Sequence, residues 1–532
     1  MHKDKNSQTK TFAVATLGCK VNQADSEAIS EQMSAAGFEQ REFNEAADIY
    51  IVNTCTVTHL GDRSSRLMIS QAHRRQPEAL LIVTGCYAER DPDGVAALPG
   101  VDLVIGNQLK DALVETIHAH QQASLPLAAR EAGESAARAG AVFAVYSAAP
   151  AHAEVLMHVD SPNYDSFQPV SGGPGALLLP MLARAEQHIG SDSVLEIDLH
   201  EPEPQPENPE RGVLVTDSAA PGLADHARLH TRTRVQMKVQ DGCDNRCTYC
   251  IVPYVRGGSR SRAIPAVVEH VRRKVRAGFQ EIVLTGIHLG DYHPEGESQR
   301  DLGDLLAALL DQTEIRRIRV SSLEPEDFRL EWLQIWQDAR MCRHFHLPMQ
   351  SGSDAILRRM ARRYLSARYR EIVLSAQRII PGVAISTDII TGFPGESDED
   401  FEQTYQLASE LHFAKAHVFR FSPRQGTPAA RMKGQIRDEI KKARSERLLA
   451  LNESDARAFR QRFLRTEVDV LIEGSKHDRW EGLTDNYLRV ELADVSANAL
   501  PYLQNRLVRA RLHGLAGDGL AGTLLAPSGY SG

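Results

Sequence analysis

The stretch Gln240-Asp-Gly-Cys243-Asp-Asn-Arg-Cys247-Thr-Tyr-Cys250 places three cysteines in one short loop, directly after a predicted strand at residues 235–239. Thiolates are the usual protein ligands of iron–sulfur clusters. Three such cysteines can bind three irons of a four-iron cubane and leave the fourth open to an amino and a carboxylate group. A zinc site needs a fourth ligand, such as a second CxxC or an HxxxH, and none follows Cys250. The loop therefore favours a cluster over zinc or structural thiols.

The region around this loop, residues 229–464, alternates strands with helices. Because six βα-type repeats are typical of a partial barrel of parallel strands, we expect an active site on the loops that follow the strands. The predicted strands are residues 235–239, 281–285, 318–322, 345–348, 384–390 and 416–421.

The first part of the chain, residues 10–120, has the same rhythm, with predicted strands at residues 11–17, 49–53, 80–84 and 101–105. This pattern predicts an α/β domain with a parallel sheet. Cys19, Cys55 and Cys86 each lie just past the end of a strand. Ligands bind at that edge of open α/β sheets, but free cysteines are also commonly buried. On the residues alone, metal ligands and buried thiols stay equally open.

The other two parts differ in composition. Residues 121–228 are rich in Ala, Pro, Gly and Ser, and the run EPEPQPENPE at 201–210 excludes a helix or a central strand there. We interpret this part as an inserted linker, partly disordered. Residues 465–528 contain short β-rich pieces separated by Gly, Asp and Asn, which predicts a small antiparallel β-barrel.

Composition narrows the class of protein. The 532 residues carry a net charge of −9, so any nucleic-acid contact must come from local basic patches, and we expect no DNA partner. No apolar run suggests a secretory signal or a membrane span, so we expect a cytoplasmic protein with no membrane partner. Seven cysteines, an odd number, argue against a disulfide framework.

Two strings carry a family resemblance. CxxxCxxC with Tyr249 before its last cysteine resembles the radical S-adenosylmethionine superfamily, and CTYCIVPYVRGGSRSR at 247–262 resembles the methylthiotransferase family. Thr16-Leu-Gly-Cys19-Lys-Val-Asn-Gln23 and Val239-Gln-Asp-Gly-Cys243 are most similar to the branch that acts on threonylcarbamoyladenosine in tRNA. The resemblance covers most of the chain outside the insertion.

The resemblance implies an activity and its cofactors. Cys243, Cys247 and Cys250 would be catalytic and hold a [4Fe-4S] cluster that passes an electron to S-adenosylmethionine. Cys19, Cys55 and Cys86 would hold a second [4Fe-4S] cluster that delivers sulfur, and a second S-adenosylmethionine would supply the methyl group. The product would be a tRNA methylthiolated at carbon 2 of N6-threonylcarbamoyladenosine, in the anticodon loop. A radical is needed because this carbon is not acidic, and a flavodoxin or ferredoxin would donate the electron.

Further residues are candidates for the cosubstrate and the RNA. Glycines and polar side chains at the predicted strand ends suit a cosubstrate pocket, although turn chemistry and helix capping explain them equally well. We expect RNA contacts from the arginines after the cysteine loop and from the tail, which resembles a TRAM-like RNA-binding barrel. The cofactor candidates are Tyr249, Thr285, Gly286, Glu324, Gln350, Gly352 and Asp388, and the RNA candidates are Arg256, Arg260 and Arg262.

Two alternatives stay open. The substrate of the same chemistry could be N6-isopentenyladenosine in tRNA or a ribosomal-protein side chain. A non-catalytic alternative is a zinc-stabilised RNA-binding protein, which metal analysis would separate. We expect a structural role for Cys342, which belongs to neither set of three cysteines.

Overall fold

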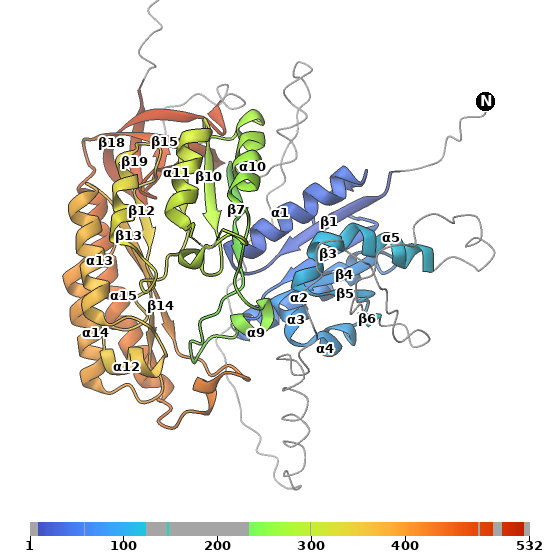
Figure 1. Ribbon diagram of the computed structural model, residues 1–532, viewed down its shortest axis with the longest axis horizontal. Coiled ribbons are helices and arrows are strands. Elements are labelled where there is room, and N and C mark those ends of the chain that lie inside the picture. The colour runs from blue at the N-terminus through green and yellow to red at the C-terminus, as the bar shows by residue number, and fades with distance from the viewer. Residues whose placement is uncertain are drawn as a thin grey trace, which may run out of the picture. The chain divides into compact units, whose positions relative to one another are not determined.

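The computed structural model describes residues 9–57, 59–123, 146–147, 233–297, 299–476, 479–492 and 503–525 (Figure 1). All of these residues belong to one compact unit. Most of the predicted insertion, residues 121–228, lies outside the described residues. Among the residues that are described, no helix has the length and apolarity to cross a membrane.

The N-terminal part is the parallel sheet that the strand pattern predicts. Its order is β2-β1-β3-β4-β5-β6, and only the pair of β5 with β6 is antiparallel. The strands are β1 (Thr11–Thr16), β2 (Glu39–Gln40), β3 (Ile49–Thr54), β4 (Leu80–Gly85), β5 (Leu103–Ile105) and β6 (Tyr146–Ser147).

Both faces of this sheet are covered, which explains why the central strand β3 is apolar along most of its length. Ile49 and Ile51 pack on one face with Ile29 of α1 (Lys20–Ala35). Tyr50 and Val52 pack on the other face with Ile69 of α2 (His59–Arg75). Successive residues of β3 therefore enter two separate cores. Further helices of this part are α3 (Cys86–Arg90), α4 (Pro92–Ala96) and α5 (Leu113–Ala123).

The central part contains the six predicted parallel strands as two sheets of three, β11-β10-β7 and β12-β13-β14. Parallel bridges from Ile318 to Met341 and from Ser322 to His346 connect the two sheets. The expected partial barrel is confirmed. Its strands are β7 (Arg234–Lys238), β10 (Glu281–Thr285), β11 (Arg317–Val320), β12 (His344–His346), β13 (Ala384–Thr391) and β14 (Lys415–Arg420).

Alternation along these strands separates a core from a polar inner face. Val235 and Met237 of β7 join the large core to which side chains of the surrounding helices also contribute. Since side chains alternate along a strand, Arg234, Gln236 and Lys238 point to the opposite face. The helices around this core are α10 (Ile264–Arg276), α11 (Leu302–Gln312), α13 (Ser366–Ile379), α14 (Asp398–Leu411) and α15 (Asp438–Gln461).

The tail forms a closed five-stranded barrel in the order β15-β16-β17-β19-β18, as expected apart from one pair. The expected antiparallel barrel has one exception among its neighbouring strands, β17 and β19, which pair in parallel. The reason is topological. Strand β18 is the antiparallel neighbour of β15, and β19 is antiparallel to β18. Strand β19 therefore has the same direction as β15, which is also the direction of β17. The strands are β15 (Glu467–Lys476), β16 (Arg479–Thr484), β17 (Arg489–Leu492), β18 (Leu507–Ala516) and β19 (Gly519–Leu524).

Two buried arginines of β11 connect the central part to this barrel. Arg319 donates to the carbonyls of Thr484 (3.1 Å) and Asp485 (2.8 Å), and Arg317 donates to the carbonyl of Asp469 (2.7 Å). Arg319 also donates through Nε to Oε1 of the fully buried Glu281, at 2.7 Å. The carboxylate of Glu281 thus balances the positive charge that the buried guanidinium of Arg319 places in the interior.

This ion pair predicts a loss of stability in acid. Burial alone would raise the pKa of Glu281, but Arg319 outweighs it and holds the pKa below the ordinary 4.5. The contribution to stability is therefore complete above about pH 4.5 and is lost as the pH falls through the lowered pKa. We expect Glu281→Gln to be less stable than wild type at about pH 7, but to lose less further stability at about pH 4.

The measurement is the denaturant midpoint at both pH values. The matched control is Glu439→Gln, because Glu439 is exposed on α15. This control should follow the wild type. If the denaturant midpoint of Glu281→Gln fell between the two pH values by as much as that of the wild type, the assignment of the acid sensitivity to this ion pair would be contradicted.

Candidate active site

The Cys243 loop is closed at its base by a short antiparallel pair, β8 (Gln240–Asp241) with β9 (Arg260–Ser261). Gly242 begins the loop with φ +74°, and a Cβ there would lie 1.9 Å from the carbonyl oxygen of Gly258. Only glycine fits this position. The N–H of Cys243 donates to the carbonyl of Gly257 at 3.0 Å, which holds the loop against its own end.

Each thiol of this loop has a polar neighbour. Arg362 Nη1 lies 3.4 Å from Cys247 Sγ, and His288 Nδ1 lies 3.6 Å from Cys243 Sγ. The N–H of Val252 donates to Cys250 Sγ at 3.4 Å. Neither Arg362 nor His288 was among the residues predicted from the sequence.

The donor set fits an iron–sulfur cluster. Burial raises the pKa of Cys247, and raises that of Cys250 to about 12, so a thiolate here needs nearby positive charge such as iron. Within the described part of the chain, no three His, Cys, Asp or Glu side chains are arranged around a single metal ion. A cubane instead distributes its cysteine ligands over separate irons. Three thiols in one loop suit that distribution.

Cys19, Cys55 and Cys86 come together at the carboxyl ends of the neighbouring strands β1, β3 and β4. Gly18 has φ +95°, and a Cβ there would lie 2.7 Å from Cys55 Sγ. The position of the Cys55 thiol thus requires a glycine at residue 18, beside Cys19. Burial raises the pKa of Cys55, and the thiols of Cys86 and Cys19 raise it further. The structure brings these three residues to one edge, and their role as cluster ligands stays a prediction.

Four of the predicted cofactor residues lie close to the Cys243 loop. Tyr249 packs edge-on against Phe393, and Glu324 forms an ion pair with Arg362. Thr285 is buried at the end of β10, and a Cβ on Gly286 would lie 2.8 Å from Gln240 Oε1. Gly286 therefore allows Gln240, which donates to the carbonyl of Gly242 at 2.8 Å, to brace the loop.

The remaining three candidates lie around β13. Gln350 has φ +59° and is fixed by backbone bonds to Asp388 and Ile390, and Asp388 lies 3.3 Å from His346. Gly352 has a packing role, because a Cβ there would lie 2.6 Å from the Cα of Thr404 in α14. The expected contact of Gly352 with a cofactor stays a prediction. Cofactor contacts of Gln350 and Asp388 stay predictions.

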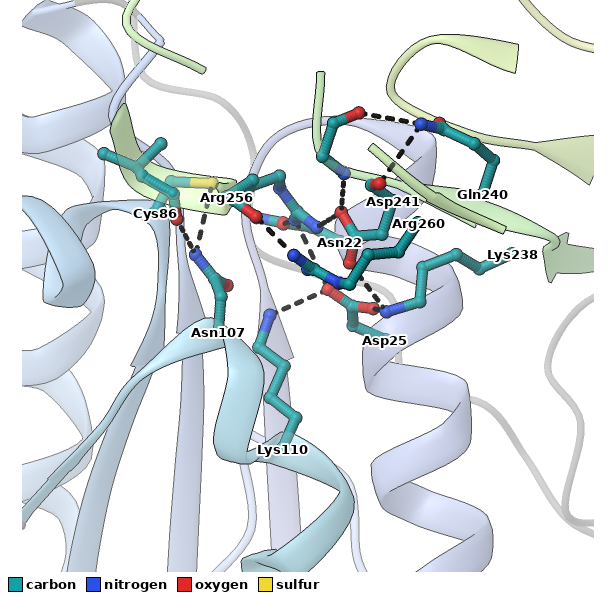
Figure 2. A network of polar contacts seen from close by, with 12 residues as sticks. Asn22, Asp25, Cys86, Asn107, Lys110, Lys238, Gln240, Asp241, Arg256 and Arg260 are labelled. Carbon is teal, nitrogen blue, oxygen red and sulfur yellow. Dashed lines mark hydrogen bonds and ion pairs between the residues drawn. The ribbon is translucent and has the colours of Figure 1, made fainter. Parts of the chain in front are cut away.

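Arg256 is not a surface residue, which corrects its expected contact with RNA. Its side chain is 1% exposed and pairs with Asp241 (2.9 Å) and Asp25 (3.3 Å) (Figure 2). Its Nη2 also donates to Asn22 Oδ1. A phosphate would have to replace buried carboxylates to reach this guanidinium. Arg260 and Arg262 are exposed, and their contact with RNA stays a prediction.

Asp25 lies at the centre of this network. Lys110 Nζ and Lys238 Nζ lie 2.7 Å and 2.5 Å from its carboxylate oxygens (Figure 2). Burial would raise the pKa of Asp25, but Lys110, Lys238 and Arg256 hold it far below its usual range. Lys238 and Arg256 come from the central part, while Asp25 and Lys110 come from the N-terminal part. The network therefore connects the parts that carry the two sets of cysteines.

Two further contacts join these parts. Asn107 Nδ2 donates to the carbonyl of Val255 at 2.7 Å, and Arg424 Nη2 lies 2.8 Å from Asp62 Oδ1. None of Asn22, Asp25 and Asn107 was predicted. The available signal was weak: Asn22 and Asp25 interrupt the buried face of a helix.

Comparisons with known proteins agree with this geometry. Residues 11–106 match the family described as uncharacterized protein family UPF0004, and residues 237–408 match the radical SAM superfamily. The solved structure of the radical S-adenosylmethionine methyltransferase TsrM from Kitasatospora setae has a TM-score of 0.50 at 14% identity. It covers 79% of this chain and 74% of that one, and shares the fold. The chain is thus a radical SAM protein, a class that uses S-adenosylmethionine and a [4Fe-4S] cluster.

Relatives narrow the class. The threonylcarbamoyladenosine tRNA methylthiotransferase MtaB of Bacillus subtilis is 33% identical over 489 residues, 90% of each chain. The tRNA-2-methylthio-N(6)-dimethylallyladenosine synthase of Moorella thermoacetica is 30% identical over 524 residues, 94% of this chain and 96% of that one. This chain belongs to the methylthiotransferase family of radical SAM enzymes. It is an enzyme that transfers sulfur-containing groups.

Proposed function

We propose that this enzyme is a tRNA methylthiotransferase that modifies carbon 2 of N6-threonylcarbamoyladenosine beside the anticodon. Relatives from Bacillus subtilis, Thermotoga maritima and Aquifex aeolicus, 33%, 31% and 31% identical, carry the threonylcarbamoyladenosine name. Relatives named for dimethylallyladenosine are similar at 29–30% identity. The choice of adenosine therefore rests on a small difference in similarity and on the strings around Cys19 and Cys243.

We further propose two [4Fe-4S] clusters, one on Cys243, Cys247 and Cys250 and one on Cys19, Cys55 and Cys86. When bound, the clusters and S-adenosylmethionine supply the one-electron chemistry, the sulfur and the methyl group that an unactivated aromatic carbon requires. The chain binds and orients them, and the burial of Cys55, Cys86 and Cys247 limits the access of water to these ligands.

One observation carries the two-cluster proposal. The buried thiol of Cys86 packs in a small cluster with Ile251, which directly follows Cys250, and with Val255. The loops that carry the two sets of cysteines are thus in contact. Sulfur transfer requires the sulfur site to lie close to the site where the substrate carbon is activated, and this contact supports that arrangement.

The substrate and the electron donor are also proposals. The anticodon loop would contact the exposed Arg260 and Arg262, while the terminal barrel would bind further RNA. A flavodoxin or ferredoxin would supply the electron.

The test is mass spectrometry of tRNA nucleosides from a strain that lacks the gene. We expect 2-methylthio-N6-threonylcarbamoyladenosine to disappear and its unmethylthiolated precursor to accumulate, while methylthiolated isopentenyladenosine is unchanged. The wild-type gene should restore the product and the Cys243→Ala gene should not. Loss of the isopentenyl product instead would refute the proposed substrate.

A further inference from the structure

A cavity of about 350 Å³ lies among the helix that follows Cys19, the strand that leads to the Cys243 loop, and the terminal barrel. The site described above does not use it. Its lining includes Lys20 of α1, Arg234 and Gln236 of β7, Arg319 of β11 and Tyr487. The cavity is therefore lined by elements that lie next to both sets of cysteines in the sequence.

The lining is electropositive. Arg234 and Arg319 lie over the ring of Tyr487, at 5.6 Å and 4.8 Å from its centre. Burial would raise the pKa of Tyr487, but Lys20, Arg234 and Arg319 outweigh it and lower the pKa. Three cations and a single carboxylate, that of Glu473, line the cavity. Such a site favours an anionic group.

Lys20 is the cation available to a ligand. Arg234 is bound to Glu473 and Arg319 to Glu281, at 2.7 Å in each case. In the described part of the chain, by contrast, no hydrogen bond or ion pair involves the ammonium group of Lys20. An ammonium group with restricted access to water gains most from a carboxylate or phosphate partner.

Gln236 adds a second unused polar group. Its Oε1 atom is buried and has no hydrogen-bond partner among the described residues. A buried acceptor without a partner is costly. If the Gln236 amide turns toward the cavity, a ligand that donates an N–H or O–H group would remove that cost. The cavity thus suits a ligand with both an anionic oxygen and a hydrogen-bond donor.

Resting on the proposed function, we propose that this cavity binds the threonylcarbamoyl substituent of the target adenosine. Its carboxylate would pair with Lys20, and its N–H or hydroxyl group would donate to Gln236. An isopentenyl substituent has neither group and would leave both residues unpaired, which is the kind of mismatch that produces strong discrimination. Lys20 and Gln236 are then specificity-determining residues.

The test is the affinity of the cluster-loaded enzyme for three anticodon stem-loops of one sequence. They carry threonylcarbamoyladenosine, isopentenyladenosine or unmodified adenosine, and binding is followed by fluorescence anisotropy. We expect the wild type to prefer the first by about tenfold or more. Lys20→Met should lose this preference while its affinity for the unmodified stem-loop and its iron content stay the same. The matched control Lys442→Met, at an exposed lysine of α15, should keep it.

A second variant guards against misfolding. Because Gln236 Oε1 is unpaired in the free protein, Gln236→Leu should not lower Tm, yet it should weaken the preference. An undiminished preference in both variants would overturn the inference. An equal loss of affinity for all three stem-loops would also overturn it, because it would assign Lys20 to an RNA phosphate. A wild type that prefers the isopentenyl stem-loop would instead refute the proposed function.

Discussion

Replacing Cys243 with alanine should abolish cleavage of S-adenosylmethionine, whereas Cys55→Ala should stop methylthio transfer and leave part of that cleavage. The two residues lie in different sets of thiols, one in the central part and one at the edge of the N-terminal sheet. If each set holds its own cluster, the loss of one ligand should affect one half of the reaction. The measurements are 5′-deoxyadenosine formation and methylthiolated nucleoside, both by chromatography.

Iron content separates this result from general damage. Two cubanes correspond to about eight irons per chain, and each variant should retain about four. Cys342→Ala is the matched control, because Cys342 is buried outside both sets and should keep the full iron content. Suppose that Cys55→Ala lost cleavage as completely as Cys243→Ala while the cluster of the set that was not mutated stayed loaded in each variant. The proposed division of labour between the two clusters would then be refuted. Stoichiometric zinc in the wild type would refute the cluster assignment itself.

The second large effect is on stability: Arg256→Met should destabilise the protein by about 1–3 kcal/mol. This variant leaves Asp25 and Asp241 without the guanidinium between them, in a region where both carboxylates are shielded from water. Lys110 and Lys238 still balance the charge of the two carboxylates, so the cost comes from the buried oxygens that lose the hydrogen bonds of the guanidinium. The measurement is the free energy of unfolding from denaturant titration.

Arg260→Met provides the comparison within the same loop. Arg260 is exposed, and its bonds are to the carbonyls of Gly258 and Arg256, each at 3.2 Å. We expect a change within about 0.5 kcal/mol for this variant. If Arg256→Met were as stable as wild type and instead lowered the salt dependence of RNA binding, the contact originally expected from the sequence would be restored.

The sequence predicts the features of the site that depend on local patterns. The apolar run at residues 49–52 identifies a doubly covered strand, and the position of Cys55 just after that strand places a thiol at the sheet edge. Parallel strands in sequence then bring Cys19 and Cys86 to the same edge. The same reasoning finds the Cys243 loop, because its three cysteines lie within eight residues of one another.

Features that depend on distant partners could not be predicted in this way. Arg256 lies in a glycine-rich basic string that suggests a surface loop, while its partner Asp25 is 231 residues away. The parallel closure of the terminal barrel depends on where β18 lies, which strand patterns do not specify. Lys20 and Gln236 look ordinary in sequence, and only the cavity between their elements distinguishes them.

The network around Asp25 has a consequence for the length of the chain between α5 and β7. Because Lys110 and Lys238 both bind Asp25, noncovalent contacts hold the two ends of that stretch in place. The entropic cost of closing a flexible loop rises by only about 0.6 kcal/mol for each doubling of its length. That increment is small beside the contribution expected from Arg256. The contacts of Asp25 therefore keep the ends of this connection in place without relying on its length.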